Sequence, residues 1–369
     1  MSKDKMISIS EIKLTDEEIE AAVRVLRSSM LRQGPECVAF EQEFAAKVGA
    51  RHAVTCANGT AALHLAYLTF LNPGDEVLVP SLTFIATASM VTMAGGKPVF
   101  CDVDPDTWLI DLSDAERRVT PRTRAIAPVH LFGNVCDIEA VQAFARKYEL
   151  IIVWDAAQAH GGTYKGRDVG SFGDFVCYSF YPSKNMFVGE GGMVCTNSPD
   201  YDYQMRYLRT HGQTGKYYHT MLGLNYRMTD VEAAIGREML KRLDSMLAVR
   251  RRNAALLTEG LSTIPGITPQ KVTPDTEHAY HQYSVLIDPD EFGCDKETLR
   301  KCLQEKGVAT GIAYPRGLHQ QPVFEELYGK QHLPVTEYIT ERIINLPVHH
   351  GLRENDVEYI VDVILAIVE

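Results

Sequence analysis

The 369-residue sequence lacks the features that mark several common classes of protein. Its eight cysteines are scattered and form no C-x-x-C pair, a usage typical of reduced, buried thiols in a cytoplasmic protein. No apolar run approaches the roughly 20 residues that span a bilayer, and the first residues hold no apolar segment of signal-peptide length. The sequence therefore predicts a soluble, cytoplasmic protein without a membrane partner.

Positive charge is also scarce. The formal net charge is -11, which argues against a nucleic-acid-binding surface but leaves room for a local basic pocket that binds a phosphorylated ligand. A cluster of basic residues in a sequence is more often part of a solvated surface than of a binding pocket. The candidate residues for such a pocket are Arg206, Arg209, His211, Lys216, Arg227 and His319.

Two catalytic motifs are missing. There is no H-E-x-x-H, and the neighbouring His349 and His350 have no partners at metal-ligand spacing, so we expect surface histidines and no metal site. The run from His211 to Lys216 ends in Gly-Lys as a P-loop does, but Thr210 occupies the position of the first glycine. Neither run of residues therefore indicates a function.

Short apolar strands alternate with helices of about 10–15 residues through the first two thirds of the chain, which predicts an α/β fold with a mostly parallel sheet covered by helices on both faces. The expected strands lie at 52–56, 76–79, 98–102, 125–128, 151–154, 175–181 and 193–196. The expected helices lie at 15–26, 35–48, 61–69, 85–93 and 138–148.

The chain is too long for one hydrophobic core, so we expect two domains. The alternation ends near residue 240, within a long charged helix. The predicted parts are an N-terminal segment at 1–14 that packs on the smaller domain, a large domain at 15–240, and a smaller α+β domain at 241–369. Within the last part we expect a strand at 281–287 and helices at 296–305 and 355–368.

Lys184 lies between two predicted strands, preceded by Ser179-Phe-Tyr-Pro-Ser and followed by Gly189-Glu-Gly-Gly. A lysine in an ordinary loop is a solvated charge. Apolar strands on both sides predict a deep position instead. The main chemical reason for a lysine there is a lowered pKa, for use as a base or as a Schiff-base amine.

Asp155 ends a predicted central strand, where ligands bind in open α/β sheets, although such a carboxylate could equally cap the next helix. An acid and a lysine at neighbouring strand ends match a pyridoxal phosphate (PLP) site, in which the acid keeps the pyridine nitrogen protonated. The turn Asn58-Gly59-Thr60 offers backbone N–H groups to a phosphate, but by itself it is more often only a helix cap.

Six runs occur in an order that resembles the DegT/DnrJ/StrS family of PLP-dependent sugar aminotransferases, which have the aspartate-aminotransferase fold (fold type I). The resemblance extends from about residue 9 to the end of the chain. The runs are Asn58-Gly-Thr-Ala-Ala-Leu, Pro80-Ser-Leu-Thr-Phe84, Asp155-Ala-Ala-Gln-Ala-His-Gly161, Ser179-Phe-Tyr-Pro-Ser-Lys184, Gly189-Glu-Gly-Gly192 and Gly223-Leu-Asn-Tyr-Arg-Met228.

The resemblance implies a role for each matching residue. Lys184 would bind PLP and later carry the proton, and Asp155 would pair with the ring nitrogen. The other implied cofactor contacts are Gln158 at the 3′-oxygen, Phe84 stacked on the ring, Gly59, Thr60 and Ser179 at the phosphate, and Asn225 reaching the phosphate from a partner subunit. Tyr314, His319 and Arg227 would lie on the substrate side, although Arg227 could equally form a structural ion pair.

The same resemblance implies amino transfer from L-glutamate to a keto group of a nucleotide-linked sugar, in a homodimer with shared active sites. An inosose, which carries no nucleotide, is the second candidate acceptor. Two further functions fit the same fold: a PLP-dependent sugar dehydratase or lyase, and a non-catalytic regulator. Lysine at 184 disfavours the dehydratase, because dehydrating members carry histidine there, and the intact set of Lys184, Asp155 and Gln158 disfavours the regulator.

Overall fold

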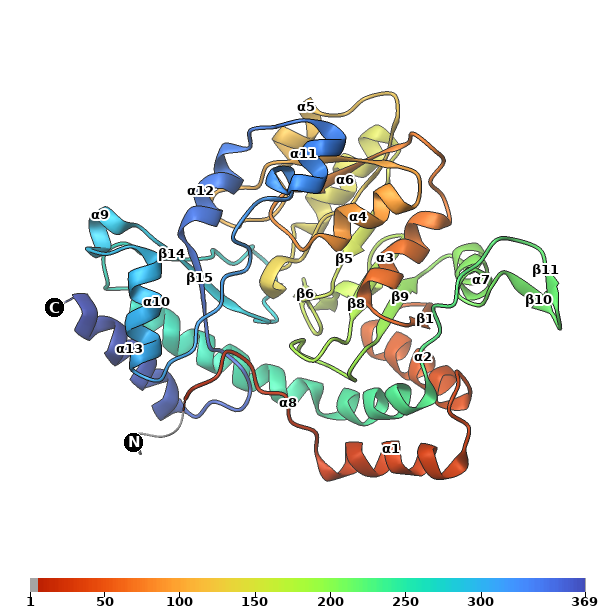
Figure 1. Ribbon diagram of the computed structural model, residues 1–369, viewed down its shortest axis with the longest axis horizontal. Helices are drawn as coiled ribbons and strands as arrows, with labels where there is room; N and C mark the ends of the chain where they lie inside the picture. The colour runs from red at the N-terminus through yellow and green to blue at the C-terminus, as the bar shows by residue number, and fades with distance from the viewer. Residues whose placement is uncertain (1–5, 369) are drawn as a thin grey trace.

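A seven-stranded β-sheet forms the centre of the larger part of the molecule in the computed structural model, which describes residues 6–368 (Figure 1). Its strand order is β1-β9-β8-β5-β4-β2-β3, and only β9 runs antiparallel to its neighbours. The predicted mostly parallel sheet is therefore confirmed. The strands are β1 (His52–Cys56), β2 (Glu76–Pro80), β3 (Lys97–Cys101), β4 (Thr123–Ile126), β5 (Ile151–Asp155), β8 (Phe175–Ser179) and β9 (Gly192–Thr196).

Helices cover both faces of this sheet. Alternate residues of a strand point to opposite faces, so Leu78 of β2 packs in one buried cluster with Phe40, while Val77 and Val79 pack in the other with Leu65. The first face carries α2 (Pro35–Val48), α6 (Ile138–Tyr148) and α8 (Asp230–Leu261). The second face carries α3 (Gly59–Leu68), α4 (Ala86–Met93) and α7 (Pro199–Leu208).

The long helix α8 connects the two parts of the molecule (Figure 1). Thr229 caps its N-terminus: the backbone N–H of Thr229 donates a 2.9 Å hydrogen bond to the carboxylate of Glu232 in a capping box. Met239 packs in the core of the large sheet, whereas Leu257 packs in a separate core further along the helix. Helix α1 (Asp16–Ser28) lies along the first half of α8.

That separate core surrounds a three-stranded antiparallel sheet of β12 (Ile267–Pro269), β14 (Tyr283–Ile287) and β15 (Ile343–Leu346). Helices α10 (Lys296–Glu305) and α13 (Glu354–Val368) pack on it. Ile7 joins the same core and exchanges backbone hydrogen bonds with Gly307 and Ala309. The boundary at residue 240 stays a prediction, because α8 runs through it unbroken; residues 1–5 of the expected N-terminal segment lie outside the described residues.

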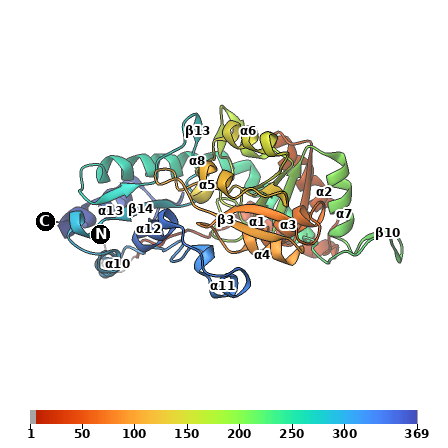
Figure 2. The ribbon, with the colours of Figure 1, turned by 90° about the horizontal axis from the view of Figure 1, so that it is seen from above.

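The remaining elements lie mostly at the edges of the two parts. A hairpin of β10 (Gln213–Gly215) and β11 (Tyr218–His219) extends away from the body in both ribbon views (Figures 1 and 2). The other short elements are α5 (Leu112–Arg117), β6 (Thr163–Tyr164), β7 (Arg167–Asp168), β13 (Thr276–Glu277), α9 (Pro289–Phe292), α11 (Pro322–Tyr328) and α12 (Pro334–Arg342), with 3₁₀ turns at Leu131–Gly133, Val169–Ser171 and Leu318–Gln320. Between residues 6 and 368, none of the helices has the length and apolar character that crossing a membrane requires.

The predicted basic pocket is wrong for three of its members: Arg206, Arg209 and the buried His319. Arg206 and Arg209 both pair with Glu41, through N–O distances of 2.6 and 2.7 Å. Arg209 is also buried and donates 2.7 Å to the carbonyl of Thr55. These guanidinium groups fasten α7 to α2 and β1, so they are not available to a ligand.

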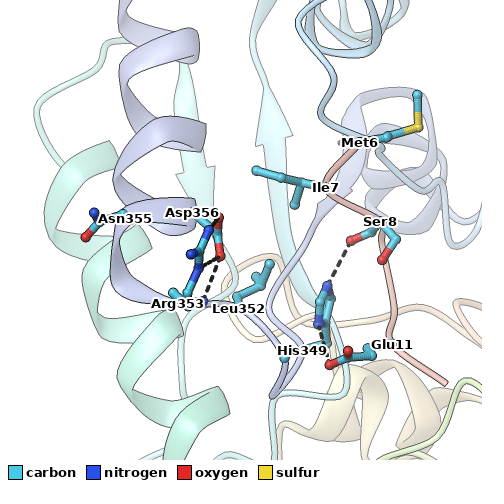
Figure 3. Close-up of a pocket in the computed structure, with 10 residues that line it drawn as sticks. Met6, Ile7, Ser8, Glu11, His349, Leu352, Arg353, Asn355 and Asp356 are labelled. Carbon is cyan, nitrogen blue, oxygen red and sulfur yellow. Dashed lines mark hydrogen bonds and ion pairs between the residues drawn. The ribbon is translucent and has the colours of Figure 1, made fainter. Parts of the chain in front are cut away.

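The expectation of a surface histidine is wrong for His349. Its side chain is buried, and its Nε2 donates 3.0 Å to the carbonyl of Ser8, which ties the N-terminal segment to the turn before α13 (Figure 3). Glu11 lies on the other side of the same ring, with one carboxylate oxygen 4.0 Å from Nδ1. These residues line a cavity of about 580 Å³ that holds none of the predicted site residues.

Candidate active site

A second cavity, of about 540 Å³, lies at the carboxyl ends of the central strands β5 and β8. In a mostly parallel sheet this edge is where ligands bind. The structure brings most of the predicted site residues together here. They are Gly59, Thr60, Phe84, Asp155, Gln158, Ser179, Lys184 and Tyr314.

Asp155 is the last residue of β5, and its side chain is almost fully buried. Its Oδ2 accepts a hydrogen bond of 2.7 Å from the Thr87 hydroxyl, and its Oδ1 accepts one of 3.1 Å from the backbone N–H of Ala157. Burial raises the pKa of Asp155, while these donors and the nearby Lys184 lower it. The arrangement suits a carboxylate that faces a protonated ring nitrogen.

Lys184 lines the same cavity, in the turn that follows β8. Its backbone N–H donates 2.9 Å to the carbonyl of Tyr181, and the adjacent Asn185 donates 2.7 Å to the carbonyl of Ala279. Burial lowers the pKa of Lys184 to about 8, although the charge of Asp155 opposes this change. Much of the amine is therefore neutral at mildly alkaline pH, as Schiff-base chemistry requires.

Gln158 and Tyr314 form a bonded pair on one wall of the cavity. The amide oxygen of Gln158 accepts a 2.6 Å hydrogen bond from the backbone N–H of Phe132. This orients the amide nitrogen, which donates a 3.0 Å hydrogen bond to the Tyr314 hydroxyl. The ring of Phe84 lies 6.3 Å from that of Tyr314 and is half exposed in the cavity. The aromatic ring can stack on a planar heterocycle, and the oriented amide can hydrogen-bond to it.

The N-terminus of α3 forms the opposite end of the cavity. Asn58 caps the helix by accepting 2.8 Å from the backbone N–H of Ala61. A Cβ at Gly59 would lie only 2.6 Å from the Cβ of Ser179, so glycine is what permits this close approach. The Thr60 and Ser179 side chains beside a helix N-terminus form a suitable cradle for a phosphate.

Three predicted residues do not line the cavity. Asn225 is exposed and Arg227 is half-buried, both on the segment between the β10–β11 hairpin and α8. His319 is fully buried, with Nδ1 at 2.7 Å from the Ser81 hydroxyl and Nε2 at 2.9 Å from a carboxylate oxygen of Glu337. The structure therefore places His319 in a bonded chain behind the cavity wall.

Sequence reasoning missed further residues that line the cavity, among them His281, Gln282 and Glu190. His281 and Gln282 come directly before β14, on a loop that Arg250 fastens by donating 3.0 Å to the carbonyl of Tyr280. The polar and aromatic run just before an apolar strand is the signal that could have indicated them. Their approach to Lys184 depends on how the second sheet packs on the first, which no local pattern specifies.

The comparison with protein-family models identifies the family of the chain. A family model described as the DegT/DnrJ/EryC1/StrS aminotransferase family matches residues 13–365. The chain belongs to this family. The resemblance stated from the sequence is confirmed, and so is the expected cofactor, because aminotransferases of this family depend on PLP. The phosphate cradle, the oriented amide, the buried acid and the lysine all fit PLP.

Individual relatives match along almost their whole length. The chain is 36% identical over 366 residues to the GDP-perosamine synthase of Caulobacter vibrioides, with 98% of each chain covered. It is 38% identical over 365 residues to the pleiotropic regulatory protein of Geobacillus stearothermophilus, with 97% of this chain and 96% of that one covered. The solved structure of S. venezuelae DesV in complex with a ketimine intermediate matches with a TM-score of 0.94 at 35% identity, covering 99% of each chain.

Proposed function

We propose that this aminotransferase moves the amino group of L-glutamate to a keto group of a nucleotide-linked sugar, in the cytoplasm, as a step of amino-sugar biosynthesis. The observation that carries the proposal is the cavity that unites Lys184, Asp155 and Gln158 with the phosphate cradle at Gly59. A GDP-perosamine synthase among the relatives supports the class of acceptor.

Each residue has a defined task in this proposal. When bound, PLP supplies a ring that withdraws electrons from the carbon that loses a proton. Lys184 holds the cofactor and then moves that proton as a general base, for which a pKa of about 8 is suitable. Asp155 stabilises the charge on the ring nitrogen, Gln158 orients the ring, and Thr60 with Ser179 binds the phosphate.

The proposal includes a homodimer with shared active sites. Asn225 and Arg227 lie outside the cavity of their own subunit, on a segment in which the apolar Leu222 is 97% exposed. In a dimer this segment would supply Asn225 to the phosphate of the partner site. Tyr314 would stay with its own subunit, on the side of the substrate.

The first test is a half-reaction with L-glutamate alone. The visible absorption band of the bound PLP should disappear as the pyridoxamine form of the cofactor accumulates, without any sugar present. The pyridoxamine-loaded enzyme is then mixed with keto sugars linked to UDP, GDP or dTDP, and the return of the band identifies the acceptor. If only free inososes restore the band, the nucleotide-sugar acceptor is wrong and the enzyme is an aminocyclitol aminotransferase.

A non-catalytic regulator is the second candidate, because one relative carries the name of a pleiotropic regulatory protein. The complete set of Lys184, Asp155 and Gln158 in one cavity favours the enzyme, since a regulator has no need of a proton-transferring lysine. The glutamate half-reaction separates the two, because a regulator or a sugar dehydratase would leave the absorption band unchanged in glutamate.

A further inference from the structure

The buried acid of the active site is bonded to a hydroxyl that no sequence motif singles out. Thr87 lies in the first turn of α4, is fully buried, and places Oγ1 at 2.7 Å from Oδ2 of Asp155. A second hydrogen bond holds Thr87 in place, because the hydroxyl of Tyr67 donates to the carbonyl of Thr87 over 3.1 Å. The contact therefore lies within the buried core.

The single proton of the Thr87 hydroxyl has three nearby acceptors. Oγ1 lies 2.7 Å from Asp155, 3.2 Å from the carbonyl of Phe84 and 3.2 Å from the hydroxyl of Thr83. Bonds to a carboxylate are shorter and stronger than bonds between neutral groups, so the proton goes to Asp155. Thr83 then donates to Thr87, which gives an oriented chain from Thr83 through Thr87 to Asp155.

We propose that Thr87 is a positioning residue of the active site, which holds the Asp155 carboxylate ionised and aimed into the cavity. The inference rests on the proposed role of Asp155 at the ring nitrogen of the cofactor, and it adds a residue to the proposed function. Thr87 does not line the cavity, so it acts only through Asp155.

The physical need for such a donor follows from burial. A carboxylate that is 5% exposed loses most of its hydration, and burial is the main influence that raises the pKa of Asp155. Thr87 and the backbone N–H of Ala157 provide its hydrogen bonds, and Lys184 is the neighbouring cation. The other titratable groups that face Asp155 are the uncharged Tyr67, Cys177 and Tyr314. Without the hydroxyl, the carboxylate would take up a proton at higher pH.

The test compares Thr87→Val, which keeps the shape but removes the hydroxyl, with Thr87→Ser, which keeps the hydroxyl. Thr92→Val is the matched control on the same helix, because the Thr92 hydroxyl bonds to that of Tyr328 and Thr92 does not line the cavity. We expect Thr87→Val to weaken PLP retention by about 10- to 100-fold, the usual loss for a bond to a charged group. The pH below which the enzyme releases PLP should rise by about one unit or more. Thr87→Ser and Thr92→Val should behave as the wild type.

A double substitution separates this inference from the proposed function. In an Asp155→Asn background, adding Thr87→Val should have little further effect, because the charge that the hydroxyl stabilises is already gone. If Asp155→Asn alone leaves PLP retention unchanged, the role of Asp155 is wrong. If Asp155→Asn weakens retention while Thr87→Val matches Thr92→Val, only the role of Thr87 is overturned. Should Thr87→Val not fold, Thr87→Ala removes the same hydroxyl and answers the same question.

Discussion

At the scale of single residues, the proposed active site contains two ionisable side chains whose charged forms lose hydration on folding. Asp155 is buried and Lys184 is partly buried, and the loss of hydration raises the pKa of Asp155 and lowers that of Lys184. Their mutual attraction opposes both shifts. The pair therefore lowers the stability of the cofactor-free enzyme, and a cofactor bound between the two groups, as proposed, would offset this loss.

This cost gives a prediction for Lys184→Met. In the native state the pKa of Lys184 is about 8, below the ordinary 10.5, so the unfolded chain binds this proton more tightly. At pH 7 the substitution should raise the free energy of unfolding of the cofactor-free enzyme by roughly 1–3 kcal/mol. The gain should shrink as the pH rises through the window between the two pKa values, where the native lysine becomes neutral. Urea unfolding at several pH values measures both effects.

Lys301→Met is the control for that experiment, because Lys301 is an exposed lysine of α10. Its substitution should change the free energy of unfolding by less than about 0.5 kcal/mol. A loss of stability in Lys184→Met at pH 7 would instead show that the partly buried amine is stabilising. The same variant should not convert glutamate, since it lacks the group that moves the proton.

At the scale of elements, the segment from residue 313 to 337 carries Tyr314 across the carboxyl edge of the sheet and is fastened at two buried points. The first is the chain of Ser81, His319 and Glu337. At the second, Asp102 accepts 2.7 Å from the backbone N–H and 2.8 Å from the hydroxyl of Thr336. Ser81 and Asp102 directly follow β2 and β3, so both attachments use the ends of sheet strands.

Two histidines bonded to the same acid allow a direct test of this attachment. His319→Ala removes a buried ring together with its hydrogen bonds to the Ser81 hydroxyl and the Glu337 carboxylate, so it should lower the free energy of unfolding by about 2–4 kcal/mol. His332 also bonds to Glu337, at 2.8 Å, but its side chain is 76% exposed. His332→Ala should therefore cost less than about 0.5 kcal/mol. Equal losses in the two variants would contradict the assignment of His319 to the buried attachment.

Hydrogen exchange separates this role from the substrate contact expected from the sequence. In His319→Ala the backbone amides around residues 313–337 should exchange faster, because the side-chain bonds from residue 319 to Ser81 and Glu337 are lost. If exchange and stability are unchanged while only the KM of the sugar rises, His319 acts on the substrate after all.

Most elements of the large part were predictable because each carries its own local pattern. The expected strand at 52–56 matches β1 and the expected helix at 138–148 matches α6, since an apolar run or a periodic apolar face specifies each. The β10–β11 hairpin was missed. Its base depends on Gly212, where a Cβ would lie 1.9 Å from the carbonyl of Met221, and such a contact has no local periodicity.

In the candidate site, too, locally specified features were predictable and those that depend on distant contacts were not. Asp155 and Lys184 were predictable because each adjoins a strand end, and Gly59 because it opens a helix. The basic pocket failed because the partner of Arg209 is Glu41, far away in the sequence. A charged residue looks the same in a sequence whether it meets a ligand or a buried acid, so only the fold decides between these outcomes.

At the scale of the whole molecule, the protruding hairpin and the exposed segment that follows it predict association. Leu222→Glu should weaken the homodimer, because it places a charge on a residue that is 97% exposed in one subunit. Sedimentation velocity at several protein concentrations should show more monomer, and PLP retention should fall if Asn225 reaches the partner site. Leu365→Glu, on α13 at the far end of the molecule, is the control and should leave the mass unchanged.

The course of the chain also has a consequence for dividing this protein into fragments. Ile7 packs in the core of the small sheet, Phe40 in the core of the large one, Leu318 again beside the large sheet, and Ile344 back in the small core. Each core is thus assembled from stretches on both sides of residue 240. A gene split at that point would leave both products with incomplete interiors, so neither half is a self-sufficient module that could be exchanged between enzymes.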